Sequence, residues 1–288
     1  MSTTAPELTI VRTVAALRAE IAAWRRSGAT VGLIPTMGGL HAGHLALVER
    51  TLREVDRAVV TIFVNPKQFG PTEDIERYPR QEMRDAGMLA ESGASLLFAP
   101  SVDEMYPAGF TTNVSVTRFI DGLDGPLRPG HFDGVATVVT KLLLQALPDV
   151  AIFGEKDYQQ LQVIRRVTQD LDIPVRIIGA PTVREADGLA MSSRNAYLSA
   201  EERAMAPAIH RTLLAVAARL RAGEPAAEAL SLGRQALANA GIARIDYLDL
   251  RDGETLAAIA ASNSRARLFA AAWLGRTRLI DNIAVAEL

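Results

Sequence analysis

The sequence predicts an α/β fold, a Rossmann-like doubly wound parallel sheet with a smaller α+β C-terminal domain. Short apolar and β-branched runs alternate with amphipathic helical stretches through the first 180 residues, as in successive βαβ units. Polar segments follow several of these runs, at the sheet edge where such folds bind ligands. After Pro181 the composition changes to alanine-rich helices. We therefore expect two domains, at residues 1–182 and 183–288.

Each element of the first domain has its own signal. Apolar, mostly β-branched runs predict strands, because such side chains suit a buried parallel sheet; these runs are 30–34, 59–64, 95–99, 150–153 and 175–178. Apolar residues at helical spacing predict helices over 14–24, 45–52, 82–91 and 161–171. The segment 135–147 is apolar almost all round, which indicates a helix buried inside the fold.

In the second domain, Ser199 followed by two glutamates resembles an N-cap with an acidic first turn. A long alanine-rich helix is expected to run from there to about Ala222, and another from Ala226 to Ala240. Three further runs predict strands, at 245–250, 267–273 and 278–280. Together they predict a small α+β unit.

The composition excludes several classes of protein. A hydrophobic fraction of 49% with 22% charged residues indicates a folded globular chain. A formal charge of −2 gives no general reason to expect nucleic-acid or membrane binding. The absence of cysteine excludes disulfides, thiolate metal sites and cysteine nucleophiles. No apolar run is long enough to span a bilayer, so we expect a soluble cytoplasmic protein.

The most informative stretch is 35–44, Pro-Thr-Met-Gly-Gly-Leu-His-Ala-Gly-His, between a predicted strand and a predicted helix. Its glycines allow positive φ and close backbone approach. Free amides and the helix dipole favour anions at a helix N-terminus. His41 and His44 share a face if the helix begins there. A glycine turn after a strand is common and usually has no binding role. Two histidines at this junction are rarer and indicate a nucleotide site.

Three more polar clusters point to the same kind of site. Residues 65–69 follow the second predicted strand of the opening βαβ unit, and residues 154–160 follow the strand at 150–153. The shared position of these clusters at strand ends is stronger evidence for a site than any one cluster alone, because a single amide side chain in a loop often only caps the backbone. A fourth cluster, 191–195, has the hydroxyls and the arginine that a triphosphate clamp needs, although a polar linker is the plainer interpretation.

These motifs resemble a known family. His-x-Gly-His resembles the ATP-binding signature of class I aminoacyl-tRNA synthetases and related nucleotidyltransferases, and the longer 35–44 string resembles the pantothenate synthetases, or pantoate–β-alanine ligases. The 191–195 cluster resembles the second synthetase signature, Lys-Met-Ser-Lys-Ser, with Ala190 and Ser193 at the two lysine positions. The cation comes one position later, at Arg194, and in this the segment resembles the pantothenate synthetases and not the tRNA synthetases. Further matches are 77–80, 128–132, 271–275 and 279–282, so the resemblance covers nearly the whole chain.

The resemblance implies ATP-dependent joining of pantoate to β-alanine through a pantoyl adenylate, with Mg²⁺ and in a homodimer. It implies catalytic roles for His44, His41, Lys156 and Arg194, His44 being either a proton donor or a stabiliser of phosphate charge. It implies that pantoate is held by Gln68 and Gln160, and metal by Asp85. The implied ATP-binding residues are Met37, Gly38, Gly39, Leu40, His41, Ala42, Gly43, His44, Gly154, Glu155, Lys156, Asp157, Val183, Met191, Ser192, Ser193 and Arg194.

Some alternatives stay open on the sequence alone. Arg128 and His131 either orient a substrate carboxylate or order a loop. The nearest rival enzyme is a nucleotidyltransferase acting on a phosphorylated small molecule. Such an enzyme needs a cationic pocket for the acceptor phosphate, and the set formed by residues 65–69 and Gln160 looks too neutral for that. A nucleotide-binding regulator without turnover is a different class, and the four polar clusters argue against it. A tRNA synthetase is not expected, because the sequence shows neither a basic surface nor an anticodon-binding extension.

Overall fold

The computed structural model describes residues 8–71 and 73–286. The chain forms two compact units. Unit 1 extends to Ile120 and adds Asp124–Glu155 and Gln160–Pro181; unit 2 comprises Asp121–Leu123, Lys156–Gln159 and the chain from Thr182 onward. The division therefore falls after Pro181, but the short segment 156–159 groups with unit 2.

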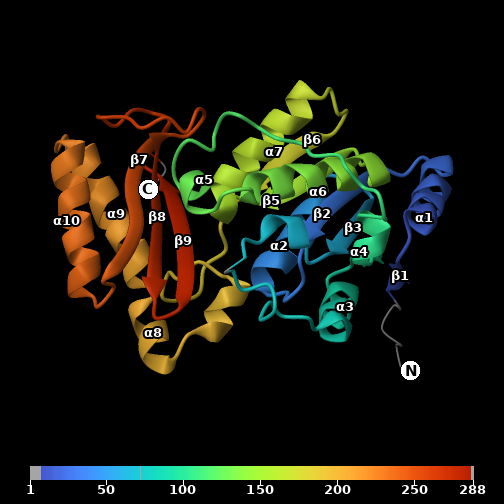
Figure 1. The fold of residues 1–288 in the computed structure, drawn as a ribbon, viewed down its shortest axis with the longest axis horizontal. Helices are drawn as coiled ribbons and strands as arrows, with labels where there is room; N and C mark the ends of the chain where they lie inside the picture. Colours follow the sequence, from blue (N-terminus) through green and yellow to red (C-terminus); the bar gives the residue numbers. More distant parts are fainter. Residues whose placement is uncertain (1–7, 72, 287–288) are drawn as a thin grey trace. The chain divides into compact units, whose positions relative to one another are not determined.

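Unit 1 is built on a six-stranded sheet whose neighbouring strands are all parallel (Figure 1). Its strands are β1 (Thr9–Val11), β2 (Val31–Thr36), β3 (Arg57–Ile62), β4 (Leu96–Phe98), β5 (Val150–Gly154) and β6 (Arg176–Ala180). Their order in the sheet is β1-β4-β3-β2-β5-β6. The strand order reverses between β2 and β5, which is the topological switch point where doubly wound sheets bind ligands. The predicted Rossmann-like fold is confirmed.

Helices and short turns connect these strands along the chain. They are α1 (Val14–Arg26), α2 (Ala42–Leu52), α3 (Glu82–Glu91), α4 (Val102–Met105), α5 (Asp124–Leu127), α6 (His131–Ala146) and α7 (Tyr158–Asp170), with 3₁₀ turns η1 (Pro66–Gln68) and η2 (Glu155–Asp157). One core cluster joins Ile34, Val60 and Leu97 from the sheet to Val48 of α2 and Leu89 of α3. Helix α6 is buried along most of its length, as predicted, and begins four residues earlier than its apolar run.

Unit 2 is a three-stranded antiparallel sheet with helices packed against it. Its strands β7 (Arg244–Asp252), β8 (Ala266–Leu274) and β9 (Thr277–Ala284) lie in chain order. Its helices are α8 (Ala200–Met205), α9 (Ala208–Arg221) and α10 (Ala226–Asn239), preceded by the 3₁₀ segment η3 (Ser193–Tyr197). Leu213 and Val216 of α9 share one core with Leu248 of β7 and Leu268 of β8. The predicted small α+β unit is confirmed.

Two local predictions are corrected by the structure. The long helix expected from Ser199 to about Ala222 is two helices, α8 and α9, with Pro207 between them. Proline has no amide hydrogen and its ring clashes with the preceding turn, so a continuous helix is interrupted there. Strand β1 is not predicted; it has three residues and pairs only at the sheet edge with β4, which leaves little sequence signal.

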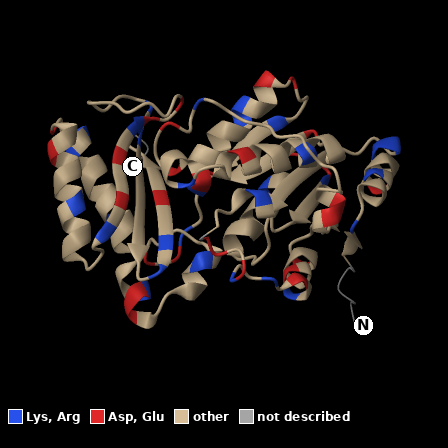
Figure 2. Ribbon diagram, viewed as in Figure 1, with Lys and Arg blue, Asp and Glu red and all other residues tan. Residues whose placement is uncertain are grey.

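The charge pattern matches the composition. Figure 2 shows basic and acidic residues interspersed along the elements of both units, with neither sign dominating. Within residues 8–71 and 73–286, no helix has both the length and the apolar character needed to cross a membrane.

Candidate functional site

The turn after β2 is shaped by two glycines with positive φ and one buried carboxylate. Gly38 has φ of 86° and Gly39 has φ of 65°, which side chains rarely tolerate. Asp85 of α3 accepts the backbone N–H of Gly39 at 2.8 Å and of Leu40 at 3.0 Å. Its side chain is 0% exposed. Asp85 thus holds the glycine turn in place, a structural task different from the metal ligation that the resemblance implies.

The two histidines form the N-terminal cap of α2. His41 is the N-cap residue, and its Nδ1 accepts the N–H of Gly43 at 3.2 Å. His44 reaches back to accept the N–H of His41 on its own Nδ1 at 3.4 Å. A backbone N–H only donates, so both Nδ1 atoms are acceptors and each neutral ring carries its proton on Nε2. The rings lie 4.1 Å apart. The cap therefore places two imidazoles, each with its proton on Nε2, at a helix N-terminus, where anions are favoured.

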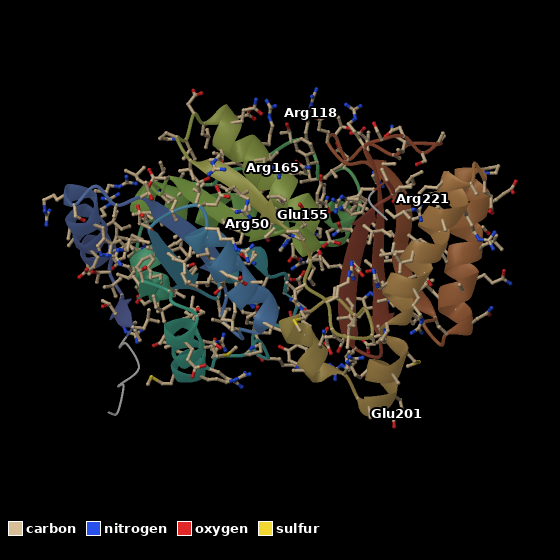
Figure 3. All side chains as sticks on the ribbon, turned by 180° about the vertical axis from the view of Figure 1, so that it is seen from behind. Arg50, Arg118, Glu155, Arg165, Glu201 and Arg221 are labelled. Carbon is tan, nitrogen blue, oxygen red and sulfur yellow. The ribbon has the colours of Figure 1, made fainter. Side chains whose placement is uncertain are left out.

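The position of this cap agrees with the fold rule for doubly wound sheets. The motif leaves the carboxyl end of β2, and the neighbouring strand β5 ends at Gly154. Glu155 follows directly and is labelled in Figure 3. Ligands bind beyond these strand ends at the switch point between β2 and β5. Unit 1 thus places the glycine motif and the start of the 154–160 cluster at the edge predicted for a nucleotide.

The side chain of Gln68 is fixed by Asn65. Asn65 donates from Nδ2 to Gln68 Oε1 and to Gly134 O, each at 3.0 Å. Its Oδ1 accepts the N–H of Lys67 at 3.2 Å and the hydroxyl of Tyr106 at 2.8 Å. Because the two backbone partners set the sense of the Asn65 amide, Gln68 must turn its Nε2 the other way. That buried amide group then faces the sulfur of Met37 at 3.1 Å, a weak acceptor.

This arrangement depends on close packing and on a protonated tyrosine. A Cβ at position 134 would lie 2.3 Å from Lys67 O, so only glycine lets α6 approach the turn η1. Burial raises the pKa of Tyr106, which keeps its hydroxyl a donor. Sequence reasoning identifies residues 65–69 as a cluster but misses the role of Asn65, and it misses Tyr106 altogether. Tyr106 is 41 residues away along the chain, and no local spacing indicates the contact.

The Arg128–His131 motif orders the loop that carries Gln68. Arg128 donates from Nε and Nη2 to the two carboxylate oxygens of Glu73, both at 2.7 Å. Its Nη1 lies 3.0 Å from His131 Nε2, which must accept because arginine only donates. His131 Nδ1–H then donates to Gln68 O at 2.8 Å. Of the two roles left open by the sequence, the contacts support loop ordering.

The pKa values of this group follow from the same contacts. Burial, reinforced by the charge of Arg128, lowers the pKa of His131 from 6.5 to about 4. Burial raises the pKa of Glu73, but hydrogen bonds from Arg128 and its charge outweigh that effect, and the pKa lies below its usual value. Near neutral pH the group therefore consists of an ionised Glu73, a charged Arg128 and a neutral His131.

We expect His131 to make folding stability fall on mild acidification. Below pH 6.5 the unfolded chain binds a proton at this imidazole, whereas the folded chain does so only near pH 4. The effect of His131 on the free energy of unfolding is therefore absent above pH 6.5, and it lowers that free energy as the pH falls toward 4. From pH 6.5 to 5, the wild type should lose about 2 kcal/mol more than His131→Gln. Urea unfolding at both pH values measures this difference; equal losses in the two proteins would contradict it.

Unit 2 gathers most of the remaining predicted residues. Lys156 and Ser192 line one small cavity together with Ala190, Asn195 and Asp281. Its volume of about 10 Å³ is close to that needed for one water molecule. Ser192 caps η3, accepting the N–H of Arg194 on its Oγ at 3.2 Å. Lys156 Nζ lies 3.6 Å from Asp157 Oδ1.

The predicted site residues are divided between the units. Those in unit 1 are Met37, Gly38, Gly39, Leu40, His41, Ala42, Gly43, His44, Gln68, Asp85, Gly154, Glu155 and Gln160. Those in unit 2 are Lys156, Asp157, Val183, Met191, Ser192, Ser193 and Arg194. Val183 accepts the N–H of Met191 at 3.0 Å and so closes a hairpin that leads into Ser192. Gln160 is half-buried on α7.

The donor set does not fit a resident metal ion. Among residues 8–71 and 73–286, no group of three His, Asp or Glu side chains is placed to hold one. Both oxygens of Asp85 already accept backbone amides. The unit 1 site offers imidazole, amide and backbone N–H donors. Unit 2, taken by itself, has hydroxyls at Ser192 and Ser193 and cations at Lys156 and Arg194. Such groups suit an anionic ligand with several oxygen acceptors, such as a nucleotide triphosphate.

Comparison with known proteins gives the family. The family model described as pantoate-beta-alanine ligase matches residues 9–284. The chain is 61% identical over 276 residues to the pantothenate synthetase of Paramagnetospirillum magneticum, covering 96% of this chain and 97% of that protein. It is 56% identical to the pantothenate synthetase of Chelativorans sp., covering 96% and 98%.

Solved structures agree over the same length. The pantothenate synthetase of Thermus thermophilus matches with a TM-score of 0.92 at 50% identity, covering 96% of this chain and 99% of that one. The pantoate-beta-alanine ligase of Francisella tularensis, solved with beta-gamma ATP and beta-alanine, matches with a TM-score of 0.82 at 32% identity, covering 96% and 98%. A glycine turn held by a buried aspartate and a helix capped by two imidazoles thus occur in a chain that belongs to the pantoate–β-alanine ligase family.

Proposed function

We propose that this chain joins pantoate to β-alanine with ATP, giving pantothenate, AMP and pyrophosphate. Membership of the pantoate–β-alanine ligase family supports the reaction. The Francisella tularensis relative, solved with beta-gamma ATP and beta-alanine, supports two of the three substrates. The structural observation that carries the proposal is the two-histidine cap of α2, which places two imidazoles at a helix N-terminus after β2, beside the switch point.

The reaction runs in two steps. In the first, a carboxylate oxygen of pantoate attacks the α-phosphorus of ATP, the bond from that phosphorus to the bridging oxygen breaks, and pyrophosphate leaves. The product is pantoyl adenylate, whose AMP is a far better leaving group than oxide. In the second, the β-alanine amine attacks the acyl carbon, the carbon–oxygen bond to AMP breaks, and the amine loses a proton. Pantothenate and AMP result.

The histidine cap acts in the first step. Negative charge grows on the phosphate oxygens as the carboxylate attacks, and preorganised donors that strengthen with that charge lower the barrier. The cap holds the rings of His41 and His44 in the tautomer that carries its proton on Nε2, and this proton is the one we assign to the phosphate. Protonating Nδ1 would break the cap, so we assign both residues as hydrogen-bond donors to phosphate and not as proton donors.

The unit 2 cluster neutralises the departing pyrophosphate. Lys156 and Arg194 are the cations of this set, and Ser192 and Ser193 supply hydroxyls. Lysine and arginine bind phosphate through charge-assisted hydrogen bonds, which are stronger than neutral ones. The remaining predicted residues of the cluster would line the nucleotide through backbone groups. We propose that unit 2 acts as the lid, since an acyl adenylate must be kept from water.

Pantoate is held by neutral amides. Gln68 presents Nε2 with only a thioether as its protein partner in the described residues, so a carboxylate or hydroxyl oxygen of the substrate would satisfy it better. Met37 beside it offers an apolar contact for the two methyl groups of pantoate. Gln160 on α7 supplies the second amide, and we place β-alanine near Gln68.

We expect Gln68→Ala and Gln160→Ala to raise the KM for pantoate by about 10- to 100-fold, the loss of one hydrogen bond to a charged group. Gln68→Ala should also weaken β-alanine use, whereas Gln160→Ala should not. Steady-state kinetics with each substrate varied in turn measures both effects. Unchanged pantoate dependence in either variant would remove that glutamine from the substrate site.

Magnesium enters this proposal only with the nucleotide. Mg²⁺ is usually held by substrate phosphates and water with one or two carboxylates, and not by a dedicated protein cage. MgATP is therefore the substrate that we propose, and no step is assigned to a metal on Asp85.

The deciding experiment is pantoate-dependent release of AMP from ATP, with and without β-alanine, with pantothenate detected by mass. We expect pantothenate only when all three substrates are present. ATP binding without AMP release or pantothenate would refute the ligase assignment and favour a regulator, while a product formed on a phosphorylated acceptor would favour the nucleotidyltransferase.

The setting of the enzyme is also a proposal. A biosynthetic ligase that consumes ATP belongs in the cytoplasm, and the family resemblance favours a homodimer that uses small-molecule substrates and no nucleic acid or membrane. Sedimentation of the purified protein tests the dimer directly.

A further inference from the structure

The segment that carries Lys156 is attached to the C-terminal sheet. Asn282 on β9 donates from Nδ2 to the backbone carbonyl of Lys156 at 2.9 Å. Residues 156–159 accordingly group with unit 2, although the residues on both sides of them group with unit 1. The Asp281–Asn282 motif, to which the catalytic proposal gives no task, thus meets a residue of the candidate phosphate site.

The contact with Arg267 determines which way the side-chain amide of Asn282 faces. Arg267 on β8 donates from Nη1 to Asn282 Oδ1 at 2.5 Å. Arginine cannot accept, so Oδ1 must face it and Nδ2 must face the Lys156 carbonyl. Asn282 is 4% exposed and Arg267 is 8% exposed, and in such buried surroundings a reversed amide would leave polar groups unpaired. One arrangement is therefore strongly preferred.

A second contact holds the same segment. The guanidinium of Arg267 lies 3.8 Å from the ring centroid of Tyr158, close enough for a cation–π contact. The Tyr158 ring also packs in an edge-to-face arrangement with the ring of Phe269 on β8, their centroids 6.0 Å apart. Two residues of the segment are thus held by adjacent strands, Lys156 through its carbonyl and Tyr158 through its ring.

Asp281, the neighbour of Asn282, contacts the second segment of the proposed phosphate site, the hairpin that leads to Ser192. Asp281 accepts Arg184 on both carboxylate oxygens, at 2.7 and 2.9 Å, and accepts the N–H of Asn282 at 2.8 Å. Arg184 pairs across the hairpin with Ala190, which precedes Ser192 by two residues. Lys156, Ala190, Ser192 and Asp281 all line one cavity. Two consecutive residues of β9 therefore contact both segments of the cluster.

We propose that Asn282, oriented by Arg267, is a positioning residue that places Lys156 in register with Ser192 for the departing pyrophosphate. The inference rests on the proposed function, in which Lys156 acts on phosphate. It has a specific consequence: Asn282 serves the first step, which handles the triphosphate, and not the second, in which β-alanine attacks a preformed adenylate.

The test uses Asn282→Asp in the full chain. This change keeps an oxygen for Arg267 but removes the N–H that holds the Lys156 carbonyl. Misplacing a catalytic group by about 1 Å can cost on the order of 100-fold in rate. We expect pantoate-dependent ATP–pyrophosphate exchange to fall by about 100-fold. Single-turnover conversion of supplied pantoyl adenylate by β-alanine should stay within about twofold of wild type, because positioning serves only the first step.

Asn263→Asp is the matched control. Asn263 also accepts a hydrogen bond on Oδ1, from the N–H of Arg265 at 2.8 Å, but that bond is local and lies in an exposed turn. The control should keep both half-reactions. Equal losses of the two half-reactions in Asn282→Asp, or an unchanged exchange rate, would overturn the positioning role. A wild-type protein that shows no pantoate-dependent exchange would instead overturn the proposed function, and the inference with it.

Discussion

His41→Asn and His44→Gln are each expected to slow adenylate formation by about 10²- to 10³-fold, the usual cost of losing one preorganised donor to a developing charge. The substitutions are chosen to keep the cap. Asparagine is among the best N-cap residues, and glutamine at the third helical position reaches back to the N-cap amide. Each variant therefore removes an imidazole Nε2–H while the helix N-terminus stays satisfied.

Pantoate-dependent ATP–pyrophosphate exchange measures the first effect, and thermal unfolding shows that the fold is kept. Glu49→Gln is the matched control on the exposed side of the same helix, where Glu49 contacts only Arg53 in the described structure. It should leave exchange unchanged. Normal exchange in His44→Gln would exclude His44 from the mechanism. Unfolding midpoints well below wild type would instead show that the imidazoles are needed for the cap itself.

Asp85→Ala is expected to destabilise the protein by about 2–5 kcal/mol, because two buried backbone N–H groups lose a charged acceptor. Those groups belong to Gly39 and Leu40, in the turn that leads into the histidine cap. The variant should also lose ATP binding, since the turn positions the motif. Asp85→Asn should fall between wild type and Asp85→Ala, because its amide offers one acceptor oxygen in place of two.

Urea unfolding measures these losses, with Asp103→Ala as the control. Asp103 is an exposed aspartate in the first turn of α4, where it should contribute less than about 1 kcal/mol. Removing Mg²⁺ with EDTA from nucleotide-free protein should leave the unfolding free energy unchanged. A stabilising effect of Mg²⁺ that disappears in Asp85→Ala would restore the metal role for this residue.

The parallel sheet can be predicted from sequence because its signals are local. Buried parallel strands are continuous apolar runs, and each helix shows one apolar stripe, so α3 has in the structure the bounds that its pattern predicts. Local signals fail where the context is not local. Strand β1 is defined by pairing with β4, 87 residues further along in the register Thr9↔Leu96. The break at Pro207 has a local signal, which the run of alanines obscures.

The sequence by itself determined the glycine motif, its two histidines and their place at a strand-to-helix junction, because those features lie within ten consecutive residues. It also supplied the residue types of the proposed phosphate site, Lys156, Ser192, Ser193 and Arg194. Only the tertiary structure decided what each polar group contacts. Asp85 binds a turn 46 residues away, and Asn282 binds a carbonyl 126 residues away. Buried polar groups take whichever partner folding brings within about 3 Å, and that partner has no spacing rule in the chain.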